Sequence, residues 1–178
     1  PRLNDLARVN LFYLMVNAAE HLKDYETALE YAKKYCQLAD YFDAHPDRLM
    51  NQVMLTQGDI LLESNRKNIH RAIFLNCKRL ERFEELCKFV DHLSWDKEYM
   101  KDKMYCFLTL EAVDQTGNYD CLTGVLTKLL ENGGIPPEFM SVIRQVCNNP
   151  DEKRRYHYRK SLVKTGSTEP EFLVWKAW

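Results

Sequence analysis

Residues that break helices are scarce over most of the chain. Before Gly117, the only glycines and prolines are Pro1, Pro46 and Gly58. Segments without glycine and proline favour long helices, because these two residues most often form turns and end helices. There is also no sustained alternation of apolar and polar residues and no Asn-Gly or Asp-Gly turn between strand-like segments. The sequence therefore predicts an all-α fold.

Apolar residues recur every three or four positions, which is the spacing of one helix face. This pattern predicts helices over about residues 3–22, 25–42, 46–64, 95–115, 119–130, 136–146 and 153–164. Between residues 69 and 93 it predicts either one long helix or two helices that are broken near Arg82. Asn68, Ser94 and Asn149 are the expected N-caps of the helices that follow them.

Length and charge narrow the class of protein. The 178 residues suit one domain, and 25 basic against 26 acidic residues leave a net charge of -1. This balance gives no electrostatic argument for nucleic acid or a membrane surface. No apolar segment approaches the length of a membrane span and no targeting segment is visible. Because residue 1 is Pro, we interpret the sequence as part of a longer protein.

The six cysteines form no CxxC pair and lie in segments with a helical pattern. Disulfide frameworks belong to loop-rich secreted chains, whereas this chain has few loop residues. We therefore expect reduced thiols that pack as small apolar side chains, in a cytoplasmic protein.

A short segment recurs at two expected joints between helices. "HLKDYETAL" places Tyr25 and Ala28 after a polar turn, and "QTGNYDCLTGVL" places Tyr119 and Leu122 in the same way. Each joint follows one helix and opens another. A recurring helix pair of this kind is typical of an α-solenoid, and an ordinary helical bundle is the alternative.

These segments resemble the tetratricopeptide repeat (TPR). "DYETALEY" is similar to the turn and second-helix core of that family, and Gly58 stands where its first helix carries a glycine. The resemblance implies a right-handed superhelix of antiparallel helix pairs over residues 1–134. It also implies that residues 135–178 form C-terminal helices and a capping tail of the same domain. No cofactor is implied.

In that family, the first helix of each pair lines a concave groove that binds a peptide or a protein. The resemblance places Asn10, Tyr13, Asn17, Glu20, Gln52, Leu55, Asp59, Glu63, Met104, Phe107, Glu111 and Asp114 at groove positions. Their amides can bond a peptide main chain, and their apolar side chains can form pockets. Because this set contains no Lys or Arg, we expect a neutral or basic extended peptide as the ligand.

Two functions follow from the resemblance. The first is the sensory or regulatory part of a larger protein, such as a transcription regulator, similar to the ligand-binding domains of TPR-type peptide-sensing bacterial regulators. The second is a constitutive scaffold that docks a partner protein. The chain has no P-loop, GxGxxG, HExxH or GxSxG motif, and its histidines are scattered, so we expect neither an enzyme nor a metal site.

Two segments near the C-terminus allow alternatives. The basic stretch "KRRYHYRK", residues 153–160, can contact nucleic acid, but a solvated terminal helix is the expected role, without direct nucleic-acid binding. The tail residues Phe172, Leu173, Val174, Trp175 and Trp178 are too apolar to stand in water together. We expect them to cap the helical stack or to pack against a second copy in a homodimer.

Overall fold

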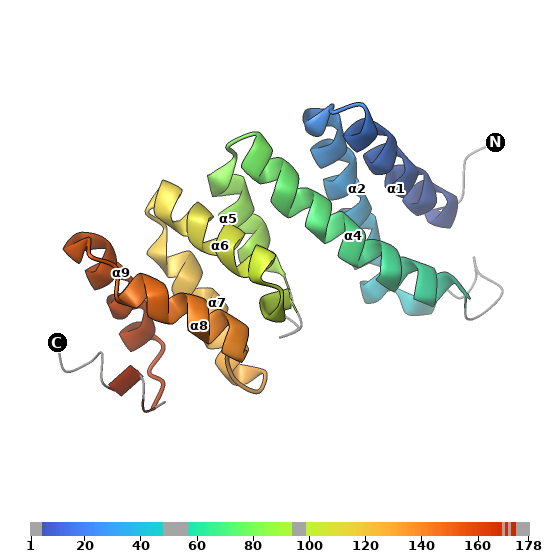
Figure 1. Ribbon diagram of the computed structural model, residues 1–178. Coiled ribbons are helices and arrows are strands. Elements are labelled where there is room, and N and C mark those ends of the chain that lie inside the picture. The colour runs from blue at the N-terminus through green and yellow to red at the C-terminus, as the bar shows by residue number, and fades with distance from the viewer. Residues whose placement is uncertain (1–4, 48–56, 94–98, 169, 171, 174–178) are drawn as a thin grey trace. The chain divides into compact units, whose positions relative to one another are not determined.

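The computed structural model describes residues 5–47, 57–93, 99–168, 170 and 172–173 (Figure 1). These residues form eight α-helices and one short 3-10 helix, and within the described ranges there is no strand. The predicted all-α class is therefore confirmed. The chain divides into two compact units, residues 1–81 and 82–178.

Unit 1 contains three described helices, α1 (Asp5–His21), α2 (Tyr25–Ala44) and α4 (Gln57–Arg79). Helices α1 and α2 form an antiparallel pair, and α2 also packs against α4 (Figure 1). Helix α2 buries the small side chains of Ala28 and Ala32, which allow close approach, and the large ones of Tyr35 and Phe42. Burying each large side chain contributes roughly 1.5 to 3 kcal/mol to folding.

Unit 2 contains α5 (Phe83–His92), the 3-10 helix η1 (Tyr99–Lys101), α6 (Lys103–Thr116), α7 (Tyr119–Glu131), α8 (Pro137–Cys147) and α9 (Glu152–Lys164). Helix α5 packs on α6 and α7, α8 packs on α6, and α9 packs on α7 and α8. The helices expected after residue 134 thus pack against α6 and α7 within this unit. Tyr158 of α9 is buried, and its hydroxyl donates to the carbonyl oxygen of Leu110 at 3.5 Å.

The same three-residue turn occurs at three joints between helices. It consists of a left-handed residue, a cap residue and an aromatic residue that opens the next helix. The three turns are Lys23–Asp24–Tyr25, Glu81–Arg82–Phe83 and Gly117–Asn118–Tyr119. The φ angles of the left-handed residues are 60°, 55° and 67°, and the cap residues have φ/ψ of -85°/77°, -91°/60° and -84°/72°. The predicted joints at Tyr25 and Tyr119 therefore have a third counterpart at Phe83.

The third turn resolves the alternative between residues 69 and 93 in favour of two helices, α4 and α5. Helix α4 is continuous from Gln57 to Arg79, so the predicted break after Ser64 and the predicted N-cap at Asn68 are wrong. Asn68 fits the helix because its side chain points to α1, where its Nδ2 donates to the Tyr13 hydroxyl at 3.4 Å.

Two other helix starts also differ from the prediction. Helix α6 begins at Lys103 rather than near Trp95, because Asp102 caps it by accepting a hydrogen bond from the Met104 amide at 2.8 Å. Helix α9 is capped by Asp151, which accepts from the Arg154 amide at 3.0 Å. Asn149, the predicted cap, instead accepts a hydrogen bond from the amide of Asp151 at 2.9 Å.

The apolar tail is described in part. Phe172 is fully buried, which confirms packing at this residue, whereas Leu173 is 48% exposed. Val174, Trp175 and Trp178 lie outside the described residues, as does the predicted cap Ser94. Capping or dimerisation through the tail therefore stays a prediction.

Candidate functional site

A cleft of about 370 Å³ lies between α1 and α4 in unit 1. Buried apolar side chains form part of its lining, and polar side chains surround them. It is lined by Tyr13, Val16, Asn17 and Glu20 of α1, and by Asn68, Ile69, Arg71, Ala72 and Leu75 of α4. Three of the residues predicted for a groove, Tyr13, Asn17 and Glu20, thus lie together in one concave surface.

The α4 side of the cleft follows the same register as the α1 side. Positions in the two helices can be compared by counting back from the left-handed residue of each joint, Lys23 after α1 and Glu81 after α4. By this count, Asn10, Tyr13 and Asn17 of α1 correspond to Asn68, Arg71 and Leu75 of α4. The α4 residues that correspond to these groove positions of α1 are therefore these three, whereas the sequence analysis placed the second set of groove positions earlier in the chain. The earlier positions Gln52 and Leu55 lie outside the described residues, as do the side chains of Asp59 and Glu63.

The same register changes the role assigned to Gly58. Phe74, which is fully buried, stands as far before Glu81 as Val16 stands before Lys23. Gly58 lies in the first turn of α4, far from this position. The glycine of the TPR pattern therefore has no counterpart at the equivalent places in α1, α4 and α6, where Val16, Phe74 and Leu110 occur.

The acidic residue at one end of the cleft is held by neighbouring side chains. Glu20 Oε1 accepts hydrogen bonds from Asn76 Nδ2 at 3.1 Å and from Arg79 Nη1 at 3.4 Å. Asn76 is fully buried, and its Oδ1 accepts from Arg79 Nη1 at 2.8 Å. The Arg79 guanidinium also lies 4.6 Å from the ring centre of Tyr25. The charge of Glu20 is therefore compensated by a network that joins α1, α4 and the first turn of α2.

Arg71 gives the cleft a positive charge. Its side chain is exposed, and among the described residues it forms no ion pair. Asn17, across the cleft on α1, is also exposed. The positions assigned from the resemblance contain no Lys or Arg, whereas Arg71, which was not among them, lines this cleft. The charge preference of the ligand therefore stays a prediction. Asn10 is exposed on α1 but does not line the cleft.

The groove residues predicted for the third pair lie on α6 in unit 2. Phe107 is 50% exposed, and Met104 and Glu111 are half-buried. Asp114 forms an ion pair with Arg154 of α9, whose Nε lies 3.2 Å from Asp114 Oδ1. Burial and the neighbouring Asp114 carboxylate raise the pKa of Tyr158, which therefore stays protonated. Asp114 thus holds α9 in place.

The basic stretch of α9 is largely engaged within unit 2. Besides the pair of Arg154 with Asp114, Arg155 Nη1 donates to the Asn149 carbonyl oxygen at 3.1 Å. Arg159 Nε donates to the Cys147 carbonyl oxygen at 3.1 Å. Lys153 and Lys160 are exposed, and the ammonium of Lys160 lies 5.7 Å from the ring centre of Tyr156. These contacts support a mainly structural role for the stretch.

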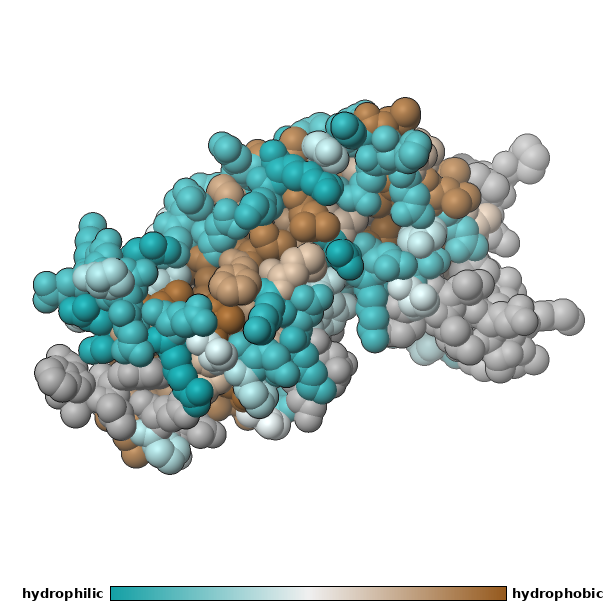
Figure 2. Space-filling model, in the orientation of Figure 1, coloured by the Kyte–Doolittle hydropathy of each residue, from teal (hydrophilic) through white to brown (hydrophobic). Residues whose placement is uncertain are grey.

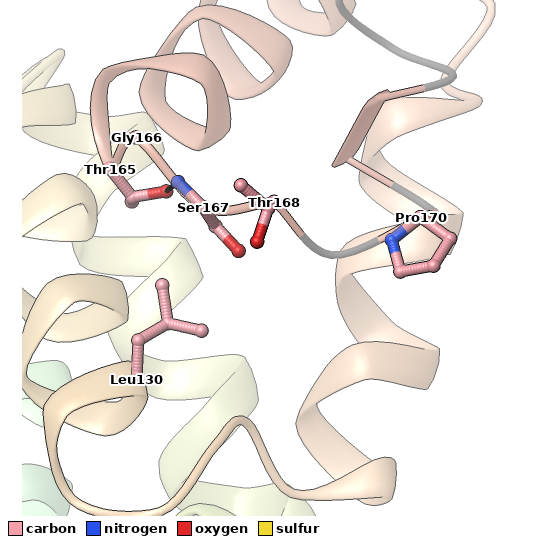
Figure 3. Close-up of a pocket in the computed structure, with 6 residues that line it drawn as sticks. All are labelled: Leu130, Thr165, Gly166, Ser167, Thr168 and Pro170. Carbon is pink, nitrogen blue, oxygen red and sulfur yellow. Dashed lines mark hydrogen bonds between the residues drawn. The ribbon is translucent and has the colours of Figure 1, made fainter.

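A second hollow, of about 500 Å³, lies in unit 2 between the end of α7 and the segment after α9. In Figure 3, the hydroxyl groups of Ser167 and Thr168 point into a space above Leu130, with Pro170 on the far side. The lining contains no charged side chain among the described residues. It therefore has fewer means of orienting a ligand than the cleft of unit 1.

The thiols differ in how their surroundings shift their pKa values. All six cysteines are free, and five of them are buried. Burial raises the pKa of Cys36, Cys106 and Cys147 to about 12, so these thiols stay protonated. Cys121 donates to the carbonyl oxygen of Cys87 at 3.7 Å, and hydrogen bonding with Cys121 lowers the pKa of Cys87. Within the described ranges, no cluster of three metal-binding side chains occurs.

Comparison of the chain with models of known families, with curated proteins and with solved structures found no match. Across the described residues, none of the helices combines the length and apolar character that crossing a bilayer requires. The interpretation of the cleft therefore depends on its own geometry and chemistry.

Proposed function

We propose that the protein is a TPR-like helical-repeat module whose α1–α4 cleft binds an extended peptide segment. The proposed architecture is a right-handed superhelix of antiparallel helix pairs. The recurring left-handed turn supports it, as does the packing of α2 on α4 and of α5 on α6, which stacks the second helix of one pair on the first helix of the next.

The observation that carries the proposal is the set of side chains at the cleft. Asn17 and Asn68 offer amides that can both donate to and accept from a peptide main chain. Val16, Ile69 and Ala72 are buried and leave an apolar lining for one or two side chains. A surface with apolar area and a few fixed polar groups is the usual chemistry of a ligand site.

The charged side chains of the cleft indicate the charge of the peptide that it binds. Glu20 is already paired with Arg79, whereas Arg71 is exposed and has no partner among the described residues. A carboxylate on the ligand can form a charge-assisted hydrogen bond with the Arg71 guanidinium. The cleft therefore favours an acidic peptide, the opposite of the preference expected from the sequence.

The test uses two heptapeptide libraries that differ only in a fixed Glu or a fixed Lys at the central position. We expect titration calorimetry to show tighter binding of the Glu library. Arg71→Ala should remove about 1.5 to 3 kcal/mol of that binding, the usual value of a hydrogen bond to a charged group. Lys67→Ala, which changes an exposed charge of α4 outside the cleft, is the matched control and should leave binding unchanged.

Binding of neither library would reject the peptide-binding function itself. Equal binding of both libraries, unaffected by Arg71→Ala, would reject the acidic preference and the role of Arg71. Tighter binding of the Lys library would show that Glu20 remains available to a ligand in spite of its partners.

A role as the sensory or regulatory part of a larger protein fits a module of this kind, because binding of a peptide between α1 and α4 would be coupled to how these helices pack. The scaffold function is the second candidate. It is favoured by exposed leucines on α1, which lie outside the cleft.

A further inference from the structure

Helix α1 exposes a line of apolar side chains on the side that faces away from α4. Leu11 is 42% exposed and Leu14 is 61% exposed, and Ala18 continues the same line at helical spacing. We call these three residues the α1 stripe. Figure 2 shows apolar surface over α1 among the polar side chains around it.

The register set by the joints identifies the counterparts of the α1 stripe. We again count back from the left-handed residues Lys23 and Glu81. By this count, Leu11, Leu14 and Ala18 of α1 correspond to Ile69, Ala72 and Asn76 of α4. These α4 residues are all buried. Ile69 and Ala72 face α1 across the cleft, and Asn76 bonds Glu20 of α1. In α4, this face is therefore the one on which the preceding helix pair stacks.

The third pair shows the same use of this face. Tyr105, Leu108 and Ala112 of α6 occupy the equivalent positions before Gly117, and all three are buried in unit 2. The helix that precedes this pair, α5, packs against α6. The face is thus covered in α4 and α6 and exposed in α1.

Charge complementarity indicates what covers the face. In α4, Arg66 forms a two-fold ion pair with Asp43 at the end of α2, with Nη1–Oδ2 at 2.7 Å and Nη2–Oδ1 at 3.1 Å. Arg8 stands as far before Lys23 as Arg66 stands before Glu81. The Arg8 side chain is 51% exposed, and its ion-pair partner is Asp5 on the same helix, at 3.2 Å. Helix α1 therefore presents both the apolar and the cationic part of the surface that α4 uses to hold the preceding pair, its apolar residues facing α1 and its arginine pairing with α2.

We propose that the α1 stripe and Arg8 dock an amphipathic helix of a partner protein, antiparallel to α1. That helix carries an apolar stripe and, at its C-terminal end, an acidic residue that pairs with Arg8, as Asp43 of α2 pairs with Arg66. This is a helix-on-helix interface, separate from the peptide cleft on the other side of α1. A second copy of the chain is a less suitable occupant, because its α2 is already packed on α1 and α4.

The test uses a peptide of residues 25–44 as a surrogate partner helix, made with Cys36→Ser and with a lactam bridge between Glu30 and Lys34. These two residues already form an ion pair on one side of α2, so the bridge suits the helix. Circular dichroism must first show that the bridged peptide is helical. Fluorescence anisotropy with the whole chain should then show saturable binding at micromolar concentration.

Leu14→Lys should weaken this binding at least tenfold, because a charged side chain replaces the most exposed leucine of the stripe. Arg8→Glu should weaken it several-fold, and a peptide with Asp43→Lys should recover binding to that variant. Val163→Lys, at an exposed apolar residue of α9, is the matched control and should bind the peptide as the original chain does.

Absence of saturable binding by the helical peptide would overturn the proposal. Binding that is unchanged in Leu14→Lys would also overturn it, because the peptide would then occupy another surface, such as the face of α4. Sedimentation of the chain without peptide gives a further check. Self-association that Leu14→Lys abolishes would assign the face to a second copy and would reject the partner helix.

Discussion

Helices α1 and α4 both precede a left-handed joint, and they place related side chains at equivalent distances from it. In α4, Ile69 and Ala72 are buried against the preceding pair, whereas Leu11 and Leu14 occupy the same places in α1 and stand in solvent. Arg66 holds Asp43 of α2, whereas the ion-pair partner of Arg8 among the described residues is Asp5 of the same helix. The two helices thus share the placement of these apolar and cationic side chains and differ in whether another helix covers the face that carries them.

This difference teaches that the exposed leucines of α1 are not accidental surface residues. Single apolar residues at a surface need no explanation, but a line of them that matches a packed face elsewhere in the chain has a specific one. Three measurements test how far the equivalence of α1 and α4 extends.

The largest effect is expected from truncating the covered face. Ile69→Ala removes a fully buried side chain and should lower the free energy of unfolding by about 2 to 5 kcal/mol, because it leaves a cavity. Leu11→Ala changes the equivalent side chain where it is 42% exposed and should cost less than about 1 kcal/mol. Urea denaturation of both variants measures the difference. Equal losses would show that the face of α1 is covered in solution.

The second measurement concerns pH, because His70 lies in α4 where α1 has Phe12. Burial, and then the charge of Arg66, lowers the pKa of His70 from the ordinary 6.5 to about 4. The folded state therefore holds this imidazole neutral, and the unfolded state takes up a proton first as the pH falls. Stability from this residue is complete above pH 6.5 and is lost between pH 6.5 and pH 4.

Replacing His70 should remove this loss. Between pH 7 and pH 4 the loss of unfolding free energy should be smaller in His70→Gln than in the original chain, by on the order of 1 to 3 kcal/mol. His21→Gln, at the exposed end of α1, is the control and should keep the original pH dependence. Identical pH profiles for His70→Gln and the original chain would mean that His70 is accessible to solvent.

The smallest effect is expected at the joints themselves. Lys23 and Glu81 have φ of 60° and 55°, a left-handed conformation that residues with a Cβ adopt at a cost. Lys23→Gly and Glu81→Gly should each raise the free energy of unfolding by about 0.5 to 1 kcal/mol, with Lys23→Ala as a neutral control. Gly117→Ala should lower it by about 1 kcal/mol from backbone strain, since the added Cβ meets no atom within 4 Å. Thermal unfolding measures all four. A gain at one joint and a loss at the other would show that the two turns are not equivalent in solution.

Much of the local structure could be predicted from the sequence. The bounds of α2 and α7, the joints at Tyr25 and Tyr119 and the helix that opens at Pro137 follow from breakers, caps and apolar spacing. These signals act within a few residues, so a single sequence contains them. The third joint was harder to predict, because Phe83 replaces the tyrosine that opens the helix after the other two joints.

A break that was predicted between Ser64 and Asn68, inside α4, displaced part of the predicted groove. The prediction ended one helix near Ser64 and began another at Asn68, so the second set of groove residues was placed too early in the chain. The part of the prediction on α1, Tyr13, Asn17 and Glu20, did fall on the cleft, because the first joint was correctly placed. A wrong boundary in a single helix is therefore enough to change which side chains, and which charges, are expected at a binding surface.

The sequence by itself determined that the chain is helical and where most helices turn, because these properties depend on backbone preferences and on the spacing of apolar residues. Only the tertiary structure decided which polar side chains pair with other residues of the chain and which remain exposed to a ligand. Glu20 and Asp114 are partnered by arginines that lie far from them in the sequence, while Arg71 is left exposed. Such pairings depend on which helices meet, and the charge of a cleft is set by the groups that remain after those pairings form.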